Sequence, residues 1–194
     1  PVDITKNRVW WPWFGNQAVD FAWPTIAPIS NGRFLIAWVR GDLSNGKWDL
    51  NIDYIVVDRH GQIIKDVTRY SEVASHNQSA NPASCAIGDA RALLLYNGEG
   101  GFSLAAIDGN GNVVVPEAHV LDHEAYLADC VRLATGEVFV TWIEQTDDLA
   151  PYSLQWLLLD GDTLQVLHGP SRLGLDPART NGTNGDLYPS VTAD

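Results

Sequence analysis

Hydrophobic and polar positions along the chain follow one pattern that occurs three times. Each copy has a short apolar strand, a turn, and a second, strongly apolar strand that ends in an aromatic residue. The three copies cover Pro24–Trp38, Pro82–Tyr96 and Ala128–Trp142. In each copy a third apolar segment then runs to an aspartate, and a further apolar run follows it. A repeat of short strands at this period indicates stacked β units.

The core of each unit is about 45 residues long. Four strands of the usual length, roughly 5–6 residues each, fit into it. Asn-Gly and Asp-Gly turns separate many of them, which is typical of β-hairpins. We expect strands at 24–30, 33–40, 48–57 and 62–68, then at 82–87, 91–97, 102–107 and 112–116, and finally at 127–133, 137–144, 152–159 and 163–168.

Four-stranded units repeated in this way predict an all-β, β-propeller-like fold with about three four-stranded blades and partial blades at both ends. We expect blades at 24–81, 82–126 and 127–187, the last with a long loop at 169–187. Residues 1–23 would supply outer strands of a preceding blade or an N-terminal extension, and 188–194 the first strand of a truncated blade. Because propellers need about four to eight blades, we expect part of a larger ring, completed by the same protein or by another protomer.

The motifs Y-P-S-V-T-A-D and N-G-R-F-L-I-A-W resemble tandem propeller-type repeats of large secreted bacterial proteins, including those beside haemolysin-type calcium-binding regions. The matching positions are Pro189, Ser190, Val191, Gly32, Trp38, Gly136, Trp142, Asp108, Gly111 and Asn112. The resemblance implies an extracellular or cell-surface location and carries no catalytic residue. The haemolysin-type glycine-rich nonapeptide is absent, so its calcium site is not transferred.

Charge excludes some partners. The chain has 12 basic and 24 acidic residues among 194, a net charge of −12, with no run of basic residues. Nucleic acids and anionic membrane surfaces need a cationic footprint, so neither is expected as a partner. No apolar stretch approaches the roughly 20 residues of a membrane span, so membrane insertion is not expected either.

The two cysteines occupy equivalent places in the second and third units. Cys85 and Cys130 would be neighbours if the inner strands of these units lie side by side. They are either two small buried apolar side chains or a disulfide, which needs a Cα separation near about 5.5 Å.

One segment has the oxygen spacing of calcium loops. Asp108, Asn110 and Asn112 place three oxygen-bearing side chains at alternate positions, which makes calcium a possible ligand. The same Asp-Gly-Asn-Gly sequence also suits a tight turn. Asp58 and Asp160 occupy the matching positions of the other two units, but different residues follow them.

Aromatic and acidic residues are further candidates. Trp10, Trp11, Trp13 and Trp48 could stack on sugar rings if they are exposed, or lie buried between blades. The carboxylates that could act as acid and base in glycan cleavage are Asp89, Glu99, Asp129 and Glu144.

His119 and His123 have the spacing of a helical metal pair, but they lie in an extended segment, where a solvated loop between blades is expected.

The sequence leads to a first hypothesis and an alternative. The first is a non-catalytic extracellular propeller module for adhesion, glycan binding or protein assembly. The alternative is a glycan-active propeller enzyme, a glycoside hydrolase or lyase, with carboxylates at the mouth of the central channel.

Overall fold

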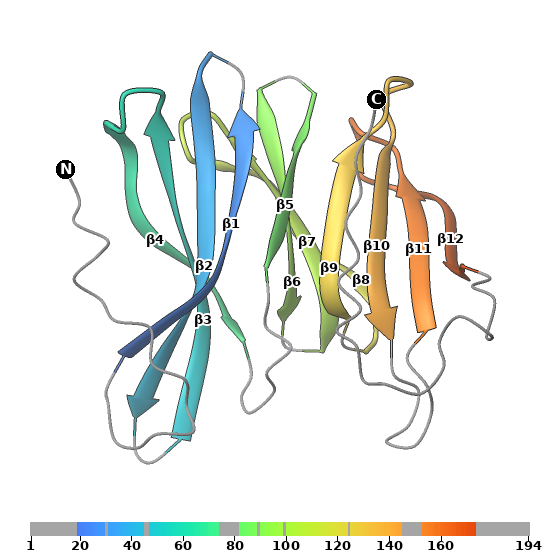
Figure 1. Cartoon of the computed structure of the whole chain (residues 1–194), viewed down its shortest axis with the longest axis horizontal. Coiled ribbons are helices and arrows are strands. Elements are labelled where there is room, and N and C mark those ends of the chain that lie inside the picture. The colour runs from blue at the N-terminus through green and yellow to red at the C-terminus, as the bar shows by residue number, and fades with distance from the viewer. Residues whose placement is uncertain are drawn as a thin grey trace, which may run out of the picture.

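Three four-stranded antiparallel sheets stand side by side in the computed structural model (Figure 1). The structure describes residues 19–29, 31–44, 47–73, 82–88, 90–98, 100–123, 125–144 and 153–173. The described segments contain no helix with the length and apolar character needed to cross a membrane.

Each sheet is a simple meander in which consecutive strands are hydrogen-bonded neighbours. Sheet 1 contains β1 (Val19–Ile29), β2 (Arg33–Ser44), β3 (Lys47–Asp58) and β4 (Ile63–Val73). Sheet 2 contains β5 (Ala83–Ile87), β6 (Arg91–Gly98), β7 (Gly101–Asp108) and β8 (Val113–Leu121). Sheet 3 contains β9 (Tyr126–Arg132), β10 (Val138–Glu144), β11 (Ser153–Leu159) and β12 (Val166–Arg172).

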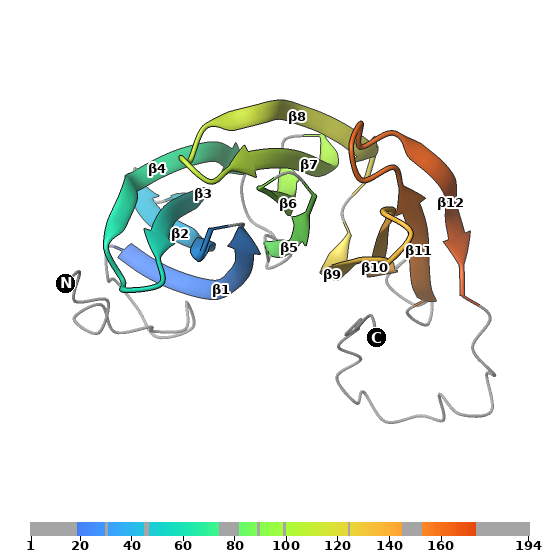
Figure 2. The ribbon, with the colours of Figure 1, turned by 90° about the horizontal axis from the view of Figure 1, so that it is seen from above.

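The sheets are arranged radially. Seen from above, they fan out along an arc, with β1, β5 and β9 on the concave side and β4, β8 and β12 on the convex side (Figure 2). Neighbouring innermost strands contact one another, β1 with β5 and β5 with β9. This is the arrangement of propeller blades, so the predicted all-β, β-propeller-like fold is confirmed.

Two apolar clusters hold the three sheets together. One lies between sheets 1 and 2 and includes Leu35, Tyr54 and Leu94; the other lies between sheets 2 and 3 and includes Leu93 and Trp142. Because successive side chains of a strand point to opposite faces, β6 supplies both clusters from alternate positions. The two central strands of sheet 2, β6 and β7, are therefore buried on both faces, which explains why they are apolar without alternation.

The inner strand of sheet 1 is longer than expected. β1 begins at Val19, so residues 19–23 belong to this sheet, and residues 19–22 pair with β2. The strand continues past Pro24 because the register shifts between Ala22 and Thr25, and Trp23 has a φ of 50°. A bulge leaves a residue outside the hydrogen-bond ladder, which is where a proline is tolerated in a strand.

The start of the expected long loop is also different. Gly169–Arg172 continue β12 instead of forming part of a loop at 169–187. The register shift between Trp156 and Leu158 absorbs Gly169 and Pro170 on this outer strand. Gly169 has a φ of 91°, and a Cβ there would lie 2.8 Å from the carbonyl oxygen of Trp156, so the bulge requires glycine. Residues 174–194, including the expected strand at 188–194, lie outside the described residues.

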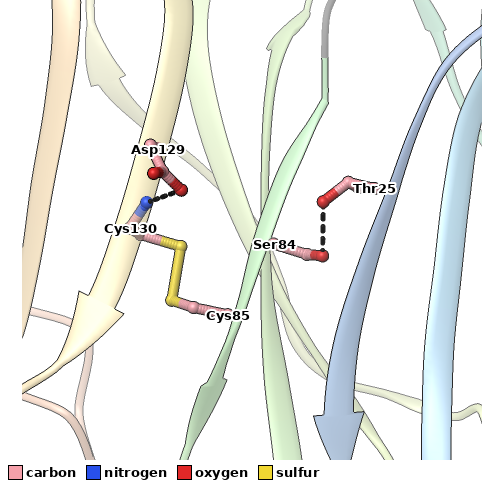
Figure 3. Close-up of a disulfide and its surroundings, with 5 residues drawn as sticks. All are labelled: Thr25, Ser84, Cys85, Asp129 and Cys130. Carbon is pink, nitrogen blue, oxygen red and sulfur yellow. Dashed lines mark hydrogen bonds between the residues drawn. A yellow bond between two sulfur atoms is a disulfide. The ribbon is translucent and has the colours of Figure 1, made fainter. Parts of the chain in front are cut away.

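The two cysteines form a disulfide between neighbouring inner strands. Cys85 of β5 and Cys130 of β9 point toward one another, with a Cα–Cα distance of 5.7 Å (Figure 3). On the other side of β5, Ser84 and Thr25 of β1 share a hydrogen bond of 2.8 Å between their hydroxyl oxygens. The inner strands are thus tied sheet to sheet at adjacent positions of β5.

We predict that the disulfide contributes substantially to stability. Replacing both Cys85 and Cys130 with alanine should lower the free energy of unfolding by about 2–4 kcal/mol, because the unfolded chain regains the conformations that the cross-link removes. Urea unfolding followed by tryptophan fluorescence measures the change. The wild-type protein under reducing conditions should lose a similar amount, and free thiols in the native oxidised protein would contradict the cross-link.

Candidate functional site

One end of the sheets collects the connections that could carry a site. Because the strands alternate in direction, the β2–β3, β6–β7 and β10–β11 connections lie at the same end as the crossings from each outer strand to the next inner strand. This is the lower end in Figure 1. Loops on a rigid scaffold are where binding and catalytic residues concentrate, so this end is the candidate location of a site.

A histidine and a glutamate meet at this end, between sheets 2 and 3. His123 lies in the crossing from β8 to β9, and Glu144 is the last residue of β10. The Nε2 of His123 is 3.2 Å from the Oε1 of Glu144. The imidazole is 51% exposed and the carboxylate 20% exposed, so both groups can be reached from solvent. A partly buried carboxylate beside an imidazole is a common acid–base arrangement.

The backbone that carries His123 is held by buried hydrogen bonds. The backbone N–H of Phe102 donates to the carbonyl oxygen of His123 at 3.0 Å. Two residues on, Asn97 of β6 binds Ala125 on both sides: its amide nitrogen donates to the Ala125 carbonyl at 2.8 Å, and its oxygen accepts from the Ala125 N–H at 2.9 Å. Asn97 is 2% exposed. The crossing is therefore fixed to sheet 2, which positions the imidazole.

The two histidines with metal-like spacing have different partners. His119 is on β8, where its Nδ1 lies 3.0 Å from the hydroxyl oxygen of buried Ser103 on β7. His123 instead meets Glu144 of the next sheet. No group of three metal-ligating His, Cys, Asp or Glu side chains occurs among the residues that the structure describes. The expected solvated loop between blades is thus a short, anchored crossing.

The sequence-selected carboxylates do not form a described pair. Asp129 precedes Cys130, which packs toward sheet 2, so Asp129 is on the opposite face of β9. Glu144 shares the face of Trp142, which packs toward sheet 2. The Oδ1 of Asp129 accepts a hydrogen bond from the Cys130 N–H at 2.8 Å. Asp89 and Glu99 lie outside the described residues.

The expected calcium segment forms a hydrogen-bonded turn between β7 and β8. The Oδ1 of Asp108 accepts hydrogen bonds of 2.8 Å from the backbone N–H groups of Asn110 and Asn112. Its Oδ2 accepts from the Asn112 amide at 3.1 Å. The Oδ1 of Asn110 accepts from Arg33 of sheet 1 at 2.7 Å. A calcium ion would have to replace these hydrogen-bond donors at the oxygens of Asp108 and Asn110. The contacts that the structure shows are those of a turn.

The same aspartate turn occurs in the other sheets. The Oδ1 of Asp58 accepts from the N–H groups of His60 and Gln62, and the Oδ1 of Asp160 from those of Asp162 and Thr163. These donors lower the pKa of both carboxyls, mainly the Gln62 N–H at Asp58 and the Thr163 N–H at Asp160.

At Asp108 two opposing effects act on the carboxyl. Desolvation alone would raise its pKa, but the hydrogen bonds from Asn112, Asn110 and Gly111 outweigh it and lower the pKa. The repeated aspartate is therefore a structural device of each outer turn.

The tryptophan cluster is mostly outside the described part of the chain. Trp10, Trp11 and Trp13 lie there, and Trp48 is described as a backbone position of β3 paired with Leu43. Within the described residues, Trp142 is fully buried between sheets 2 and 3. Trp156 stacks on Phe139 with ring centroids 5.6 Å apart.

Sequence reasoning missed one buried carboxylate. Asp53 of β3 is 1% exposed and lies between Arg40 Nη1 at 3.6 Å and Arg69 Nε at 3.8 Å. It stands in the otherwise apolar run I-D-Y-I-V-V, which is the signal that could have indicated it. The two arginines come from the strands on either side, so it is an internal ion pair of sheet 1.

Comparisons with known proteins address the fold. No family model and no curated protein matches the chain. Among solved structures, it is similar to an α-L-arabinanase from Penicillium chrysogenum complexed with arabinobiose, with a TM-score of 0.56 and 13% identity over 76% of this chain and 43% of that one. A protein of unknown function from Dyadobacter fermentans has a TM-score of 0.55 and 15% identity, with 83% and 57% covered. A GH43 endo-arabinanase from Bacillus licheniformis has a TM-score of 0.51 and 14% identity, with 84% and 61% covered.

These similarities support the propeller-like fold and correct one expectation. The chain spans about half the length of the solved structures that it matches. Two of these three are arabinanases by name, so the comparison favours the glycan-active alternative over a non-catalytic extracellular module, which was the wrong first choice. The resemblance to repeats of secreted bacterial proteins and the extracellular location stay predictions.

The aspartate turns predict a loss of stability in acid. Groups whose pKa is lowered by folding stabilise the protein fully above their unfolded pKa of about 3.9, and this contribution is lost as the pH falls through the folded value. We expect the free energy of unfolding, measured in urea, to fall below about pH 4. Asp108→Asn should reduce that decline, whereas Asp66→Asn on an exposed part of β4 should leave it unchanged. An equal decline in both variants would contradict the assignment.

The Asn97 bridge is expected to stabilise the crossing that carries His123. Asn97→Ala leaves the N–H and carbonyl of Ala125 without these partners, which should lower the free energy of unfolding by about 1–3 kcal/mol. Hydrogen exchange at the Phe102 amide, which donates to His123, should also become faster. Gln165→Ala at an exposed position is the matched control, and equal stability of the two variants would show that the bridge is not needed.

Proposed function

We propose that the chain is part of a glycan-active propeller enzyme that hydrolyses glycosidic bonds, with Glu144 as an acid–base residue. The contact between the partly exposed side chains of Glu144 and His123, which come from two adjacent sheets, carries this proposal. Its carboxylate is partly shielded by packing, yet it remains accessible to a substrate.

The chemistry follows from the needs of glycosidic cleavage. One carboxylic acid protonates the leaving oxygen while a second carboxylate activates water or attacks the anomeric carbon. His123 orients the Glu144 carboxylate through the 3.2 Å contact. Glu144 is therefore a carboxylate held in one position, as one of the two carboxyl groups of this chemistry must be.

The second carboxylate must come from another segment. Asp129 is on the opposite face of sheet 3, so it is not the partner of Glu144. Glu99 immediately precedes Gly100 in the connection between β6 and β7, and this connection leads to Phe102, which binds the backbone of His123. Glu99 is therefore the first candidate for the second role.

The substrate class is supported by the fold relatives. Arabinanases from Penicillium chrysogenum and Bacillus licheniformis share the propeller-like arrangement of this chain. Because one propeller fold hosts many activities, the similarity suggests arabinan as the first polysaccharide to test and does not replace the site argument.

We expect the protein to release reducing sugars from a polysaccharide in a panel that begins with linear arabinan. Glu144→Gln keeps the shape of the side chain but removes its acid–base function, so the rate should fall by about 10²-fold or more. His123→Ala should change the pH profile of kcat/KM, because the carboxylate loses its positioning partner. Asp66→Asn is the control variant and should retain full activity.

Two results would overturn the proposal. Undiminished activity of Glu144→Gln would remove this residue from the reaction. Binding of the polysaccharides without cleavage of any of them by the wild-type protein would exclude the enzyme class itself. Glu99→Gln, assayed in parallel, tests the second carboxylate independently.

A further inference from the structure

An arginine near the start of the second strand joins each of the first two sheets to the next one. In sheet 1, Arg33 Nη1 donates to the carbonyl oxygen of Gly109 at 2.8 Å and to the Oδ1 of Asn110 at 2.7 Å. Both acceptors lie in the turn after the third strand of sheet 2. The arginine thus ties the inner hairpin of one sheet to the outer turn of its neighbour.

The second sheet repeats this contact. Arg91 Nη1 donates to the carbonyl oxygen of Asp162 at 3.1 Å, and its Nη2 lies 3.4 Å from the carbonyl oxygen of Gly161. The same guanidinium is 3.5 Å from the Asp162 carboxylate. Gly161 and Asp162 follow Asp160 as Gly109 and Asn110 follow Asp108. We call this repeated interaction, from Arg33 and from Arg91, the hairpin clamp.

The third sheet has the opposite charge at this position. Arg33 pairs with Asp58 and Arg91 with Asp108 across the second and third strands. Val138 pairs with Leu159, so the position opposite Asp160 belongs to Glu137. Its carboxylate accepts a hydrogen bond from the hydroxyl of Thr135. A carboxylate cannot donate to carbonyl oxygens, so a clamp made by Glu137 requires a turn that offers positive charge or donors.

The first sheet has such a turn. The positions that match Gly109 and Asn110 are Arg59 and His60, both exposed in the β3–β4 turn. The Nε of Arg59 donates to the His60 Nε2 at 3.1 Å. Among the described residues no sheet precedes sheet 1, so no hairpin clamp reaches this turn. The acidic hairpin of sheet 3 and the basic turn of sheet 1 are complementary in charge and in position.

We propose that sheet 3 of one copy packs against sheet 1 of a second copy, with Glu137 bound to Arg59 and His60. This continues the order in which sheet 1 meets sheet 2 and sheet 2 meets sheet 3. The contact is head-to-tail. In a dimer, sheet 3 of each copy meets sheet 1 of the other, so that six sheets surround one axis. Six lies within the range of about four to eight blades that close a propeller.

Apolar side chains accompany the charges on both faces. Ile26 of β1, next to Thr25 and therefore on the face away from sheet 2, is 61% exposed. On the face of sheet 3 that points away from sheet 2, Phe139 and Trp156 form a stacked pair. Neighbouring sheets in this chain already pack through such apolar faces, so the second copy extends an interface of known kind.

Charge reversal tests this interface by mass and does not depend on the proposed enzyme activity. Sedimentation equilibrium of the wild-type chain should show a dimer. Glu137→Arg and Arg59→Glu should each raise the dimer dissociation constant at least tenfold, because each alone places like charges across both interfaces. Asp66→Arg, an equally large charge change on exposed β4, should leave the constant unchanged.

Mixing the two single variants is the decisive experiment. In a heterodimer of Glu137→Arg with Arg59→Glu, both interfaces again join opposite charges, so native mass spectrometry should show the mixed dimer in preference to either homodimer. This recovery also proves that both variants are folded. A wild-type chain that is monomeric at all concentrations, an unaffected Glu137→Arg dimer, or no mixed dimer would each overturn the proposal.

Discussion

Burial of both faces of β6 and β7, the central strands of sheet 2, is the constraint on which the rest of this structure depends. Leu93 and Leu95 pack toward sheet 3, whereas Leu94 and Tyr96 pack toward sheet 1. A strand that is apolar on both sides must have a layer on each side, since exposed apolar area costs about 25 cal/mol per Å². The outer strand β12 is exposed along its whole length, whereas the central strands β6 and β7 are almost wholly buried.

Polar and covalent links then set the exact relation of neighbouring sheets, because apolar packing alone is not directional. The Thr25–Ser84 hydrogen bond and the Cys85–Cys130 disulfide act at the inner strands. The hairpin clamps of Arg33 and Arg91 act at the start of the second strand of sheets 1 and 2. Because the same positions recur in each unit, Glu137 can be recognised as a departure from Arg33 and Arg91 at the matching positions.

The candidate site is built on this scaffold, but its contact is not one of those that recur from sheet to sheet. His123 and Glu144 lie where the chain crosses from one sheet to the next, and Asn97 holds that crossing. The sequence indicated both residues, but for different reasons: the histidine for its spacing from His119, and the glutamate as one of several carboxylates. Their contact was not predictable, because 20 intervening positions and the stacking of two sheets bring them together. The preference for a non-catalytic module failed because a structural repeat motif contains no information on what the loops do.

Local pattern by itself determined the elements of this protein. Turn-forming Asn-Gly and Asp-Gly pairs, apolar runs and the recurring aspartate predicted twelve strands whose ends differ from the observed ones by a few residues. Two of the larger departures, the start of β1 at Val19 and the extension of β12 past Pro170, are at bulges, where pairing with a neighbouring strand overrides the usual effect of proline. Tertiary structure alone decided which distant groups meet: the cysteines as a disulfide, Asp129 away from Glu144, and Asn110 with Arg33. The reason is that strand identity depends on neighbours along the chain, whereas these contacts depend on how whole sheets stack.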